Sequence, residues 1–244
     1  MSSIPGGVGV SERVLIVNAD DFGRSPGVNR GVITCHEKGI VTSASLMVRW
    51  PHAEEAAAYA RHSSLGVGLH LDLGEWEYHG GAWEPCYEVL PQESDEAVAL
   101  ELRRQLEAFE RMVGRPPDHL DSHQHVHRQE PVRGAVLAVG GRLGVPVRGA
   151  SPVIAYSGVF FGQDGKGRPV AEAITVEALI SAIEDLPSGI TELACHPAAT
   201  PDHDSAYGRE RVREVEALCD PRVRAAIHRC GIMLESFAGA QVRA

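Results

Sequence analysis

The chain alternates short apolar runs with helical patterns along most of its 244 residues. The first run, at 14–17, is apolar on both faces, which is typical of a strand in a parallel sheet. Ser25 and Pro26 then predict a helix start, as an N-cap residue followed by a proline in the first turn. About seven such strand–helix units follow one another without an internal repeat or a linker. This alternation predicts a parallel sheet covered by helices.

The apolar runs predict seven strands, at residues 14–17, 41–48, 65–71, 119–123, 145–149, 191–195 and 232–237. The helical patterns between them predict seven helices, at 25–38, 53–60, 95–112, 131–143, 175–186, 208–218 and 221–229. Residues 72–93 show no periodicity and contain two of the three tryptophans. Because a long loop in a compact domain is usually functional, we expect this segment to form a functional loop.

Polar side chains follow four of the expected strands, at the carboxyl end of each. They are Asp20 with Asp21, His70, His123 and His196. Active sites of (β/α) barrels lie on this rim, so the sequence favours an α/β fold with a (β/α) barrel of about seven parallel strands over an open doubly wound sheet. We expect residues 13–244 to form one such domain after a flexible leader, residues 1–12. No G-x-G-x-x-G motif or P-loop follows the first strand, which is evidence against a nucleotide cofactor.

The chain is acidic, with 33 Asp and Glu against 23 Lys and Arg, and its formal net charge is −10. This balance is evidence against nucleic-acid binding and against docking on an anionic membrane. No segment approaches the roughly 18 apolar residues of a membrane span, and the amino terminus lacks the pattern of a signal peptide. We therefore expect a soluble, cytoplasmic protein. The five scattered cysteines form no C-x-x-C motif, which argues against a disulfide scaffold or a zinc knuckle.

Asp20 and Asp21 lie side by side directly after the first strand. Like charges this close raise one another's pKa unless a cation separates them. A metal ion bound by one carboxylate would leave the other free to act as a base. Because successive side chains of an extended strand point to opposite sides, the backbone must bend here if both are to face one site. The alternative interpretation is that these residues only cap a helix or a turn.

Three histidines follow one another at intervals of two residues, at His123, His125 and His127. All three share one face if the segment is extended, whereas only the first and third share a face if it is helical. Imidazoles gathered in this way indicate a metal site, although spacing alone does not identify the ligands. His70 lies at the end of another strand, where Asp72 could orient its imidazole ring.

His196 directly follows Cys195 at the end of a later strand. A thiol nucleophile is disfavoured, because adjacent strand residues face apart and no basic group is present to lower the thiol pKa. We expect Cys195 to pack in the core and His196 to be a candidate general acid. Together, the carboxylates and histidines form the ligand set of a catalytic site with open metal positions, not of a closed, cysteine-rich structural site.

Several long motifs occur in an order and spacing that resemble the YdjC-like carbohydrate deacetylases, which include chito-oligosaccharide deacetylases. The matching segments are residues 15–23, 39–43, 68–70, 119–123 and 195–197. The resemblance extends from about residue 13 to the last strand. It implies a (β/α) barrel and a metal-dependent hydrolase that removes an acetyl group from an N-acetylated sugar.

The resemblance also implies a role for each site residue: Asp21, His70 and His123 as metal ligands, Asp20 as general base and His196 as general acid. The family's metal is usually taken as Mg²⁺, whereas two imidazoles and a carboxylate would suit Zn²⁺ better. By analogy with the polysaccharide deacetylases, His127 could replace His70 as a ligand. The roles of His125 and His127 stay open.

The expected loop differs from the chito-oligosaccharide members, although its aromatic residues Trp76, Tyr78 and Trp83 suit stacking on a sugar. The expected partner is therefore an N-acetylated saccharide whose identity is open. Arg148, at another strand end, is a candidate to hold the oxyanion together with the metal. The oligomeric state is open, with a homo-oligomer among the alternatives.

Three other functions fit the same residues less well. One is a different metal-dependent barrel hydrolase such as a phosphodiesterase, and another is a sugar isomerase. Two close metal ions would favour phosphoryl chemistry, but carboxylates for a second metal site are too few. The third is a non-catalytic sugar-binding protein, which would have no need of the acid and base at His196 and Asp20.

Overall fold

The computed structural model describes residues 12–91, 94–201 and 207–241. Seven parallel strands form one sheet: β1 (Arg13–Phe22), β2 (Ser43–Leu46), β3 (Gly66–Leu71), β6 (Leu120–Ser122), β7 (Ile154–Ser157), β8 (Gly189–Cys195) and β9 (Ile232–Leu234). Their order is β6-β3-β2-β1-β8-β7, and β9 pairs with the first part of β1. Of the expected leader, 1–12, only Glu12 lies among the described residues.

The expected α/β fold with about seven parallel strands is confirmed. The curled sheet forms a half-barrel, because its edge strands β6 and β7 do not pair within the described part of the chain. β1 is the central strand, and its residues are buried from Val14 to Phe22. Since the strands are parallel, their carboxyl ends all lie along one rim.

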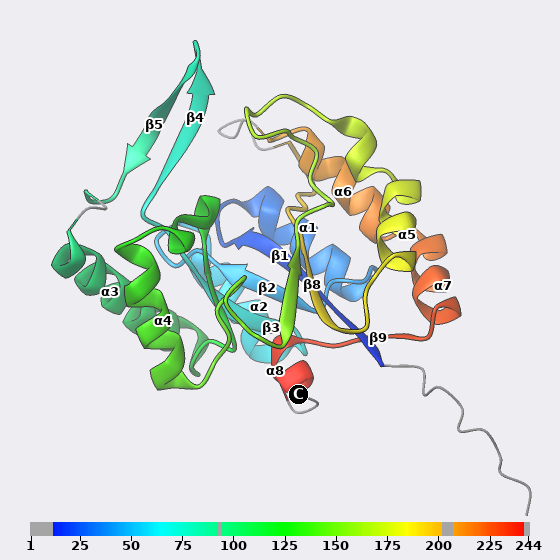
Figure 1. Cartoon of the computed structure of the whole chain (residues 1–244), viewed down its shortest axis with the longest axis horizontal. Coiled ribbons are helices and arrows are strands. Elements are labelled where there is room, and N and C mark those ends of the chain that lie inside the picture. The colour runs from blue at the N-terminus through cyan, green and yellow to red at the C-terminus, as the bar shows by residue number, and fades with distance from the viewer. Residues whose placement is uncertain (1–11, 92–93, 202–206, 242–244) are drawn as a thin grey trace, which may run out of the picture.

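Helices α3 and α4 lie at the left of the curled sheet in Figure 1, and helices α5 to α7 lie at its right. The helices are α1 (Pro26–Glu37), α2 (Ala53–His62), α3 (Asp95–Val113), α4 (Val132–Leu143), α5 (Val176–Glu184), α6 (Glu210–Leu218), α7 (Pro221–Arg229) and α8 (Phe237–Gln241), with 3₁₀ turns η1 (His123–Arg128) and η2 (Ala171–Ile174). The predicted cap of α1 is present, since the Ser25 side chain accepts a hydrogen bond from the Val28 amide. None of the described helices combines the length and apolarity that crossing a membrane requires.

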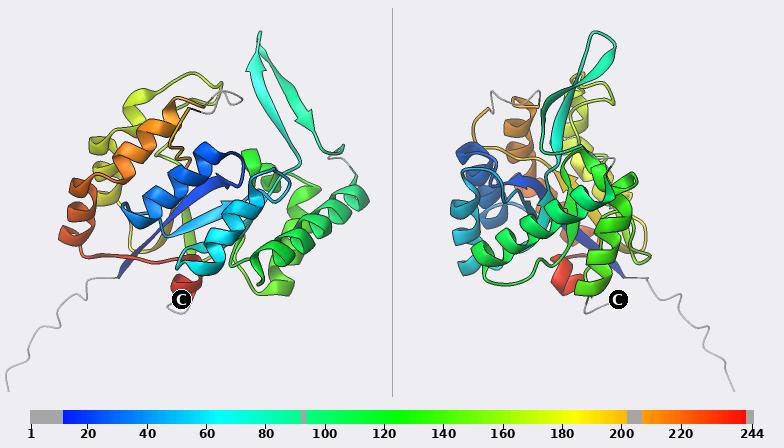
Figure 2. Two further views of the ribbon diagram at one scale, coloured as in Figure 1. Left: turned by 180° about the vertical axis from the view of Figure 1, so that it is seen from behind. Right: turned by 90° about the vertical axis from the view of Figure 1, so that its left-hand side faces the viewer.

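The expected loop at 72–93 is instead largely a β-hairpin. Strands β4 (Gly74–His79) and β5 (Ala82–Glu88) pair antiparallel and project beyond the rim of the sheet (Figure 2). The two residues that join them, Gly80 and Gly81, both have positive φ angles, which this tight turn requires. The glycine pair was therefore the local signal of a hairpin.

The prediction of a strand at 145–149 is also wrong. Only a single bridge, between Leu120 and Val147, forms there, and the strand of this region is β7, several residues later. Pro146 has no amide hydrogen to donate to a neighbouring strand, and Gly149 turns the chain with a φ of 69°. At the other end of the chain, the expected last strand is shorter, because Phe237 begins α8.

Candidate active site

The backbone at the end of β1 directs the side chains of two adjacent acids, Asp20 and Asp21, to one site. Asp21 has a left-handed backbone, with a φ of 64°, and the pairing of β1 with β2 shifts register between Ala19 and Phe22. Such an irregularity re-aims a side chain that would otherwise point away. Asp20 and Asp21 consequently both reach His70, which lies with each of them in a group of potential metal ligands.

The ligand atoms of Asp21, His70 and His123 all lie within 4.8 Å of one another, and all three residues are buried. Asp21 Oδ1 lies 3.4 Å from His70 Nε2 and 3.1 Å from His123 Nδ1. Its other oxygen, Oδ2, accepts a 2.5 Å hydrogen bond from Arg211. Burial would raise the pKa of Asp21, but Arg211 and His123 hold it well below its ordinary value. Asp21 is therefore an anion with one oxygen directed at two imidazoles.

Asp121 orients the His70 ring. Its Oδ1 lies 2.8 Å from His70 Nδ1, and the two residues are paired neighbours on β6 and β3. This leaves His70 Nε2 facing Asp21. The prediction that Asp72 would orient the His70 ring is wrong, because β3 ends at Leu71. Asp72 instead accepts hydrogen bonds from Arg49, Trp50 and Tyr87.

The carboxylates around the two imidazoles favour a positive charge at this position. Burial would lower the pKa of His70, yet the Asp121 carboxylate raises it to about 10. Burial would also lower the pKa of His123, but the Asp21 carboxylate raises it above its ordinary value. Among the described residues, the Nε2 atom of His123 has no hydrogen-bond partner, and it lies 3.7 Å from Glu75 of β4. Two imidazoles and a carboxylate held this way fit a divalent cation in a site with open positions.

His125 and His127 lie outside this ligand group. Gln124 and His125 both have left-handed backbones, so the segment is neither the extended strand nor the regular helix that the spacing suggested. His125 contacts the Tyr156 hydroxyl at 3.1 Å. Both ring nitrogens of His127 have protein partners, at Ser122 Oγ and the Arg148 carbonyl. This geometry favours His70 over His127 as a ligand.

Arg148 binds Asp20, and all three nitrogens of its guanidinium group contact carboxylates. Its two Nη atoms donate to the two oxygens of Asp20 at 2.6 and 2.7 Å, and Nη2 also lies 2.8 Å from Asp121. Its Nε donates to Glu192 at 2.6 Å. The expected oxyanion role of Arg148 is not supported by this arrangement. Burial would raise the pKa of Asp20, but Arg148 keeps it below its ordinary value, so Asp20 is ionised.

His196 lies on the same rim, with its Nε2 3.7 Å from Asp20 Oδ2 and about 20% of its side chain exposed. Its backbone amide donates to Glu214, and the rings of Phe161 and Tyr207 lie beside its own. Burial lowers the pKa of His196 to about 4, so the resting imidazole is neutral. Asp202 and Asp204, which follow His196 by a few positions in the sequence, lie outside the described residues.

Cys195 is buried, as expected, and its thiol contacts the Asn18 carbonyl at 3.4 Å. Burial raises its pKa well above the ordinary value, which agrees with a packing role. Several site residues were not predicted from the sequence, Arg211 and Glu75 among them. Arg211 reaches Asp21 from α6, 190 positions away, and Glu75 reaches His123 from the hairpin, so neither had a local signal.

The hairpin is fastened to the histidine turn beside the candidate ligands. The side chain of Gln124 accepts a hydrogen bond from the Trp76 amide and donates one to the Trp76 carbonyl, at 3.0 and 2.8 Å. Further out, the rings of Tyr78 and Trp83 meet edge to face at 5.6 Å, and Trp83 is 54% exposed. The hairpin thus presents aromatic surface to solvent beyond the rim.

Residues 14–229 match the family model of the YdjC-like proteins. A chitooligosaccharide deacetylase from Serratia marcescens is 33% identical over an alignment of 255 positions, which covers 93% of this chain and 98% of the relative. A carbohydrate deacetylase from Geobacillus stearothermophilus is 36% identical over 242 residues, with coverages of 92% and 97%. A crystal structure from Enterococcus faecalis V583, of a protein proposed to cleave cellobiose phosphate, has a TM-score of 0.74 and 29% identity over 93% of this chain and 98% of that one. Because the family match spans most of its length, the chain belongs to the family of YdjC-like proteins.

Proposed function

We propose that this chain is a metal-dependent carbohydrate deacetylase that hydrolyses the acetamide group of an N-acetylated sugar. The observation that carries the proposal is the convergence of Asp21, His70 and His123, with the ionised Asp20 directly beside them. A ligand set with a neighbouring base is what the hydrolysis of an amide by activated water requires. The choice of an acetylated sugar as substrate is supported by the names of the Serratia and Geobacillus relatives, which are called deacetylases of carbohydrates.

In this proposal, Asp21, His70 and His123 hold one divalent cation. When bound, the cation would polarise the acetyl carbonyl and lower the pKa of a water molecule. Family resemblance favours Mg²⁺, whereas the two imidazole ligands favour Zn²⁺. Asp121 and Arg211 keep the ligands in place, the first by its contact with His70 and the second by its hydrogen bond to Asp21.

The proton transfers are assigned to Asp20 and His196. Asp20 is ionised, so its carboxylate can accept a proton from the attacking water. His196 is neutral at rest and must gain a proton before it can protonate the departing amine. Asp20 Oδ2 lies 3.7 Å from His196 Nε2, beyond hydrogen-bond distance, so the two groups border one reacting centre without a direct proton path between them. The aromatic rings of the hairpin, from the half-buried Tyr78 and the exposed Trp83, would contact the sugar beyond the reacting group.

The test measures acetate release from a panel of N-acetylated mono- and oligosaccharides. The purified chain is stripped with a chelator and reloaded separately with Mg²⁺ or Zn²⁺. We expect the stripped protein to be inactive, and one of the two metals to restore acetate release at one ion per chain. Failure of every metal-loaded sample to release acetate from any substrate would refute the deacetylase assignment. Full activity in a preparation shown by elemental analysis to be metal-free would refute the metal requirement.

A further inference from the structure

Two cysteines that are 184 positions apart in sequence meet on the flank of the sheet, away from the candidate metal ligands. Cys35 lies near the end of α1, and Cys219 is the C-cap residue that follows α6. Their Sγ atoms lie 3.9 Å apart, and Cys219 Sγ also contacts the Thr34 carbonyl. We infer that Cys35 and Cys219 form an oxidative modification site, which a hydroperoxide converts to a disulfide.

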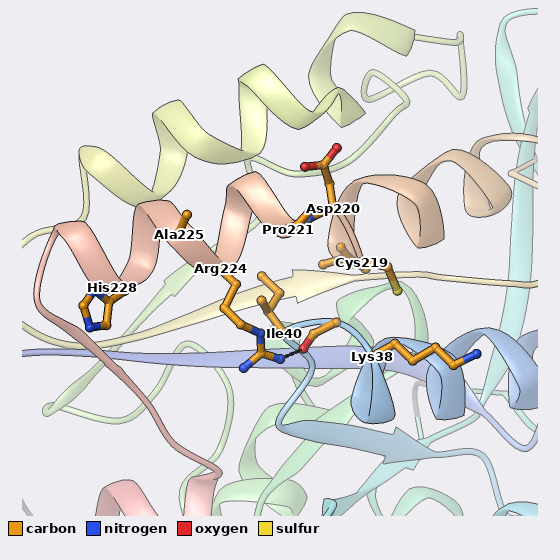
Figure 3. Close-up of a pocket in the computed structure, with 10 residues that line it drawn as sticks. Lys38, Ile40, Cys219, Asp220, Pro221, Arg224, Ala225 and His228 are labelled. Atoms are coloured by element: carbon orange, nitrogen blue, oxygen red, sulfur yellow. Dashed lines mark hydrogen bonds between the residues drawn. The ribbon is translucent and has the colours of Figure 1, made fainter.

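The two thiols differ in access, as a nucleophile and its resolving partner must. Cys35 is fully buried, whereas Cys219 is half-buried and lines a pocket of about 510 Å³. Lys38, Arg224 and His228 line the same pocket (Figure 3). A small peroxide entering there would therefore meet Cys219 before Cys35.

The surroundings of Cys219 favour its thiolate. The hydrogen bond with Cys35 and the nearby Lys38 ammonium lower the pKa of Cys219 to about 7, although burial opposes this. Since the thiolate is the nucleophile in thiol oxidation, a half-exposed cysteine beside a cation is the kind that reacts. Cys35 shows the opposite behaviour, because its contact with Cys219 and its burial raise its pKa well above the ordinary value.

Close backbone packing fixes this geometry. A Cβ atom at Gly39 would lie 2.6 Å from the Leu218 carbonyl oxygen and 2.7 Å from the Cys35 carbonyl oxygen. Only glycine lets the turn after α1 approach the end of α6 so closely. Arg224 of α7 donates to the Gly39 carbonyl and so holds the same turn from another side. The two sulfur atoms must close from 3.9 Å to a bond of about 2.05 Å, a change within reach of side-chain rotation.

The reaction balances with one hydroperoxide molecule. The Cys219 thiolate attacks one peroxide oxygen, the O–O bond breaks, and the leaving alkoxide or hydroxide takes up a proton. Cys219 is then a sulfenic acid. The Cys35 sulfur attacks the Cys219 sulfur, and the thiol proton leaves with the displaced hydroxide as water. Two thiols are thereby oxidised to one disulfide, and the peroxide is reduced to water and an alcohol, or to two waters.

The linkage would join two helices that border the candidate site. α1 follows directly after the strand that ends in Asp20 and Asp21. α6 carries Arg211, which binds Asp21, and Glu214, which accepts the His196 amide hydrogen. A covalent link between these helices closes a very long loop, and cross-links of long loops stabilise most.

The experiment treats the full-length reduced protein with a small excess of hydrogen peroxide. We expect the count of free thiols in the denatured protein to fall from five to three. Peptide mapping without reductant should find Cys35 joined to Cys219, and dithiothreitol should reverse the link. The melting temperature should rise by about 5 °C or more on oxidation. Cys86→Ser, which changes an exposed cysteine of the hairpin, is the matched control and should leave the linkage intact.

Two variants separate the roles of the thiols. Cys219→Ser should abolish the linkage, whereas Cys35→Ala should leave Cys219 as a sulfenic acid that dimedone traps. Cys35→Ala removes a buried thiol and can destabilise the protein. Cys219→Ser changes a half-exposed residue, so this variant tests the linkage even if Cys35→Ala does not fold. Peroxide treatment that over-oxidises Cys219 in the wild type, or that links either cysteine to a different partner, would overturn the inference.

Discussion

Arg148 grips both carboxylate oxygens of Asp20, from Nη1 to Oδ2 at 2.6 Å and from Nη2 to Oδ1 at 2.7 Å. The same Nη2 lies 2.8 Å from Asp121, which in turn holds the Nδ1 atom of His70. One guanidinium therefore connects the proposed base to the carboxylate that orients a proposed metal ligand.

His123→Ala should weaken divalent-metal binding at least tenfold, as the loss of a ligand does. The matched control is His125→Ala, which removes an imidazole two residues away that hydrogen-bonds Tyr156 and lies outside the ligand group. Isothermal titration with Zn²⁺ and elemental analysis measure both. Full metal occupancy in His123→Ala would remove this residue from the ligand set.

Asp121→Asn should lower metal affinity by roughly 10- to 100-fold, because the carboxylate that fixes the His70 ring is lost while the ligand itself stays. Asp72→Asn is the control, since this buried acid lies two residues from His70 but pairs with Arg49, Trp50 and Tyr87. Circular dichroism checks that both variants are folded. Equal affinities in the two variants would contradict the orienting role.

Asp20→Asn should keep the metal and lose roughly 10²–10⁴ in the rate of acetate release, the usual contribution of a general base. Asparagine preserves the shape of the side chain, and Arg148 retains its contacts with Asp121 and Glu192. Turnover and metal content are measured on the same preparation. An unchanged rate would refute the base assignment, whereas loss of the metal would make Asp20 a ligand.

His196→Ala should slow N-acetylated sugars far more than activated acetate esters. A departing amine needs a proton, whereas a weakly basic alcohol leaves with little help. The comparison uses an acetamide and an activated ester of the same leaving sugar or phenol, each at saturation. If both substrates slow by the same factor, His196 positions the substrate and does not deliver a proton.

Glu214 should make stability depend on pH. Burial raises its pKa to about 8 from an ordinary value of 4.5, so the folded state favours the protonated form. Its stabilising contribution is fully present below pH 4.5 and is lost as pH rises through 8. Glu214→Gln, which stays neutral, should flatten the fall in melting temperature between pH 5 and 8. The exposed Glu216→Gln on the same helix is the control, and a wild-type slope in both variants would exclude Glu214 as the source.

The sequence predicted the parts of the fold that local patterns control. Apolar runs marked the central strands, and the Ser25–Pro26 pair marked the start of α1. The polar ends of β1, β3 and β6 predicted that Asp21, His70 and His123 would meet, because parallel strands end on one rim. The requirement that the backbone bend at Asp21 also followed from the sequence, since adjacent strand residues otherwise face apart.

Relationships between distant segments could not be predicted in this way. Neither the choice of Asp121 over Asp72 as the partner of His70 nor the position of Arg148 between three carboxylates has a local signal. Both depend on which strands become neighbours. The left-handed turn at Gln124 and His125 likewise escaped, because its geometry depends on contact with the hairpin.

The position of Arg148 also has a consequence for how the chain folds. Arg148 stands 128 positions after Asp20, and Glu192 follows it by another 44. A buried carboxylate without its cation is strongly destabilising, so the centre of the sheet is electrically balanced only once both halves of the chain have come together. An amino-terminal fragment that ends before Arg148 would have to bury Asp20 uncompensated. We therefore expect the two halves of the chain to fold cooperatively, because the contacts of Arg148 require both.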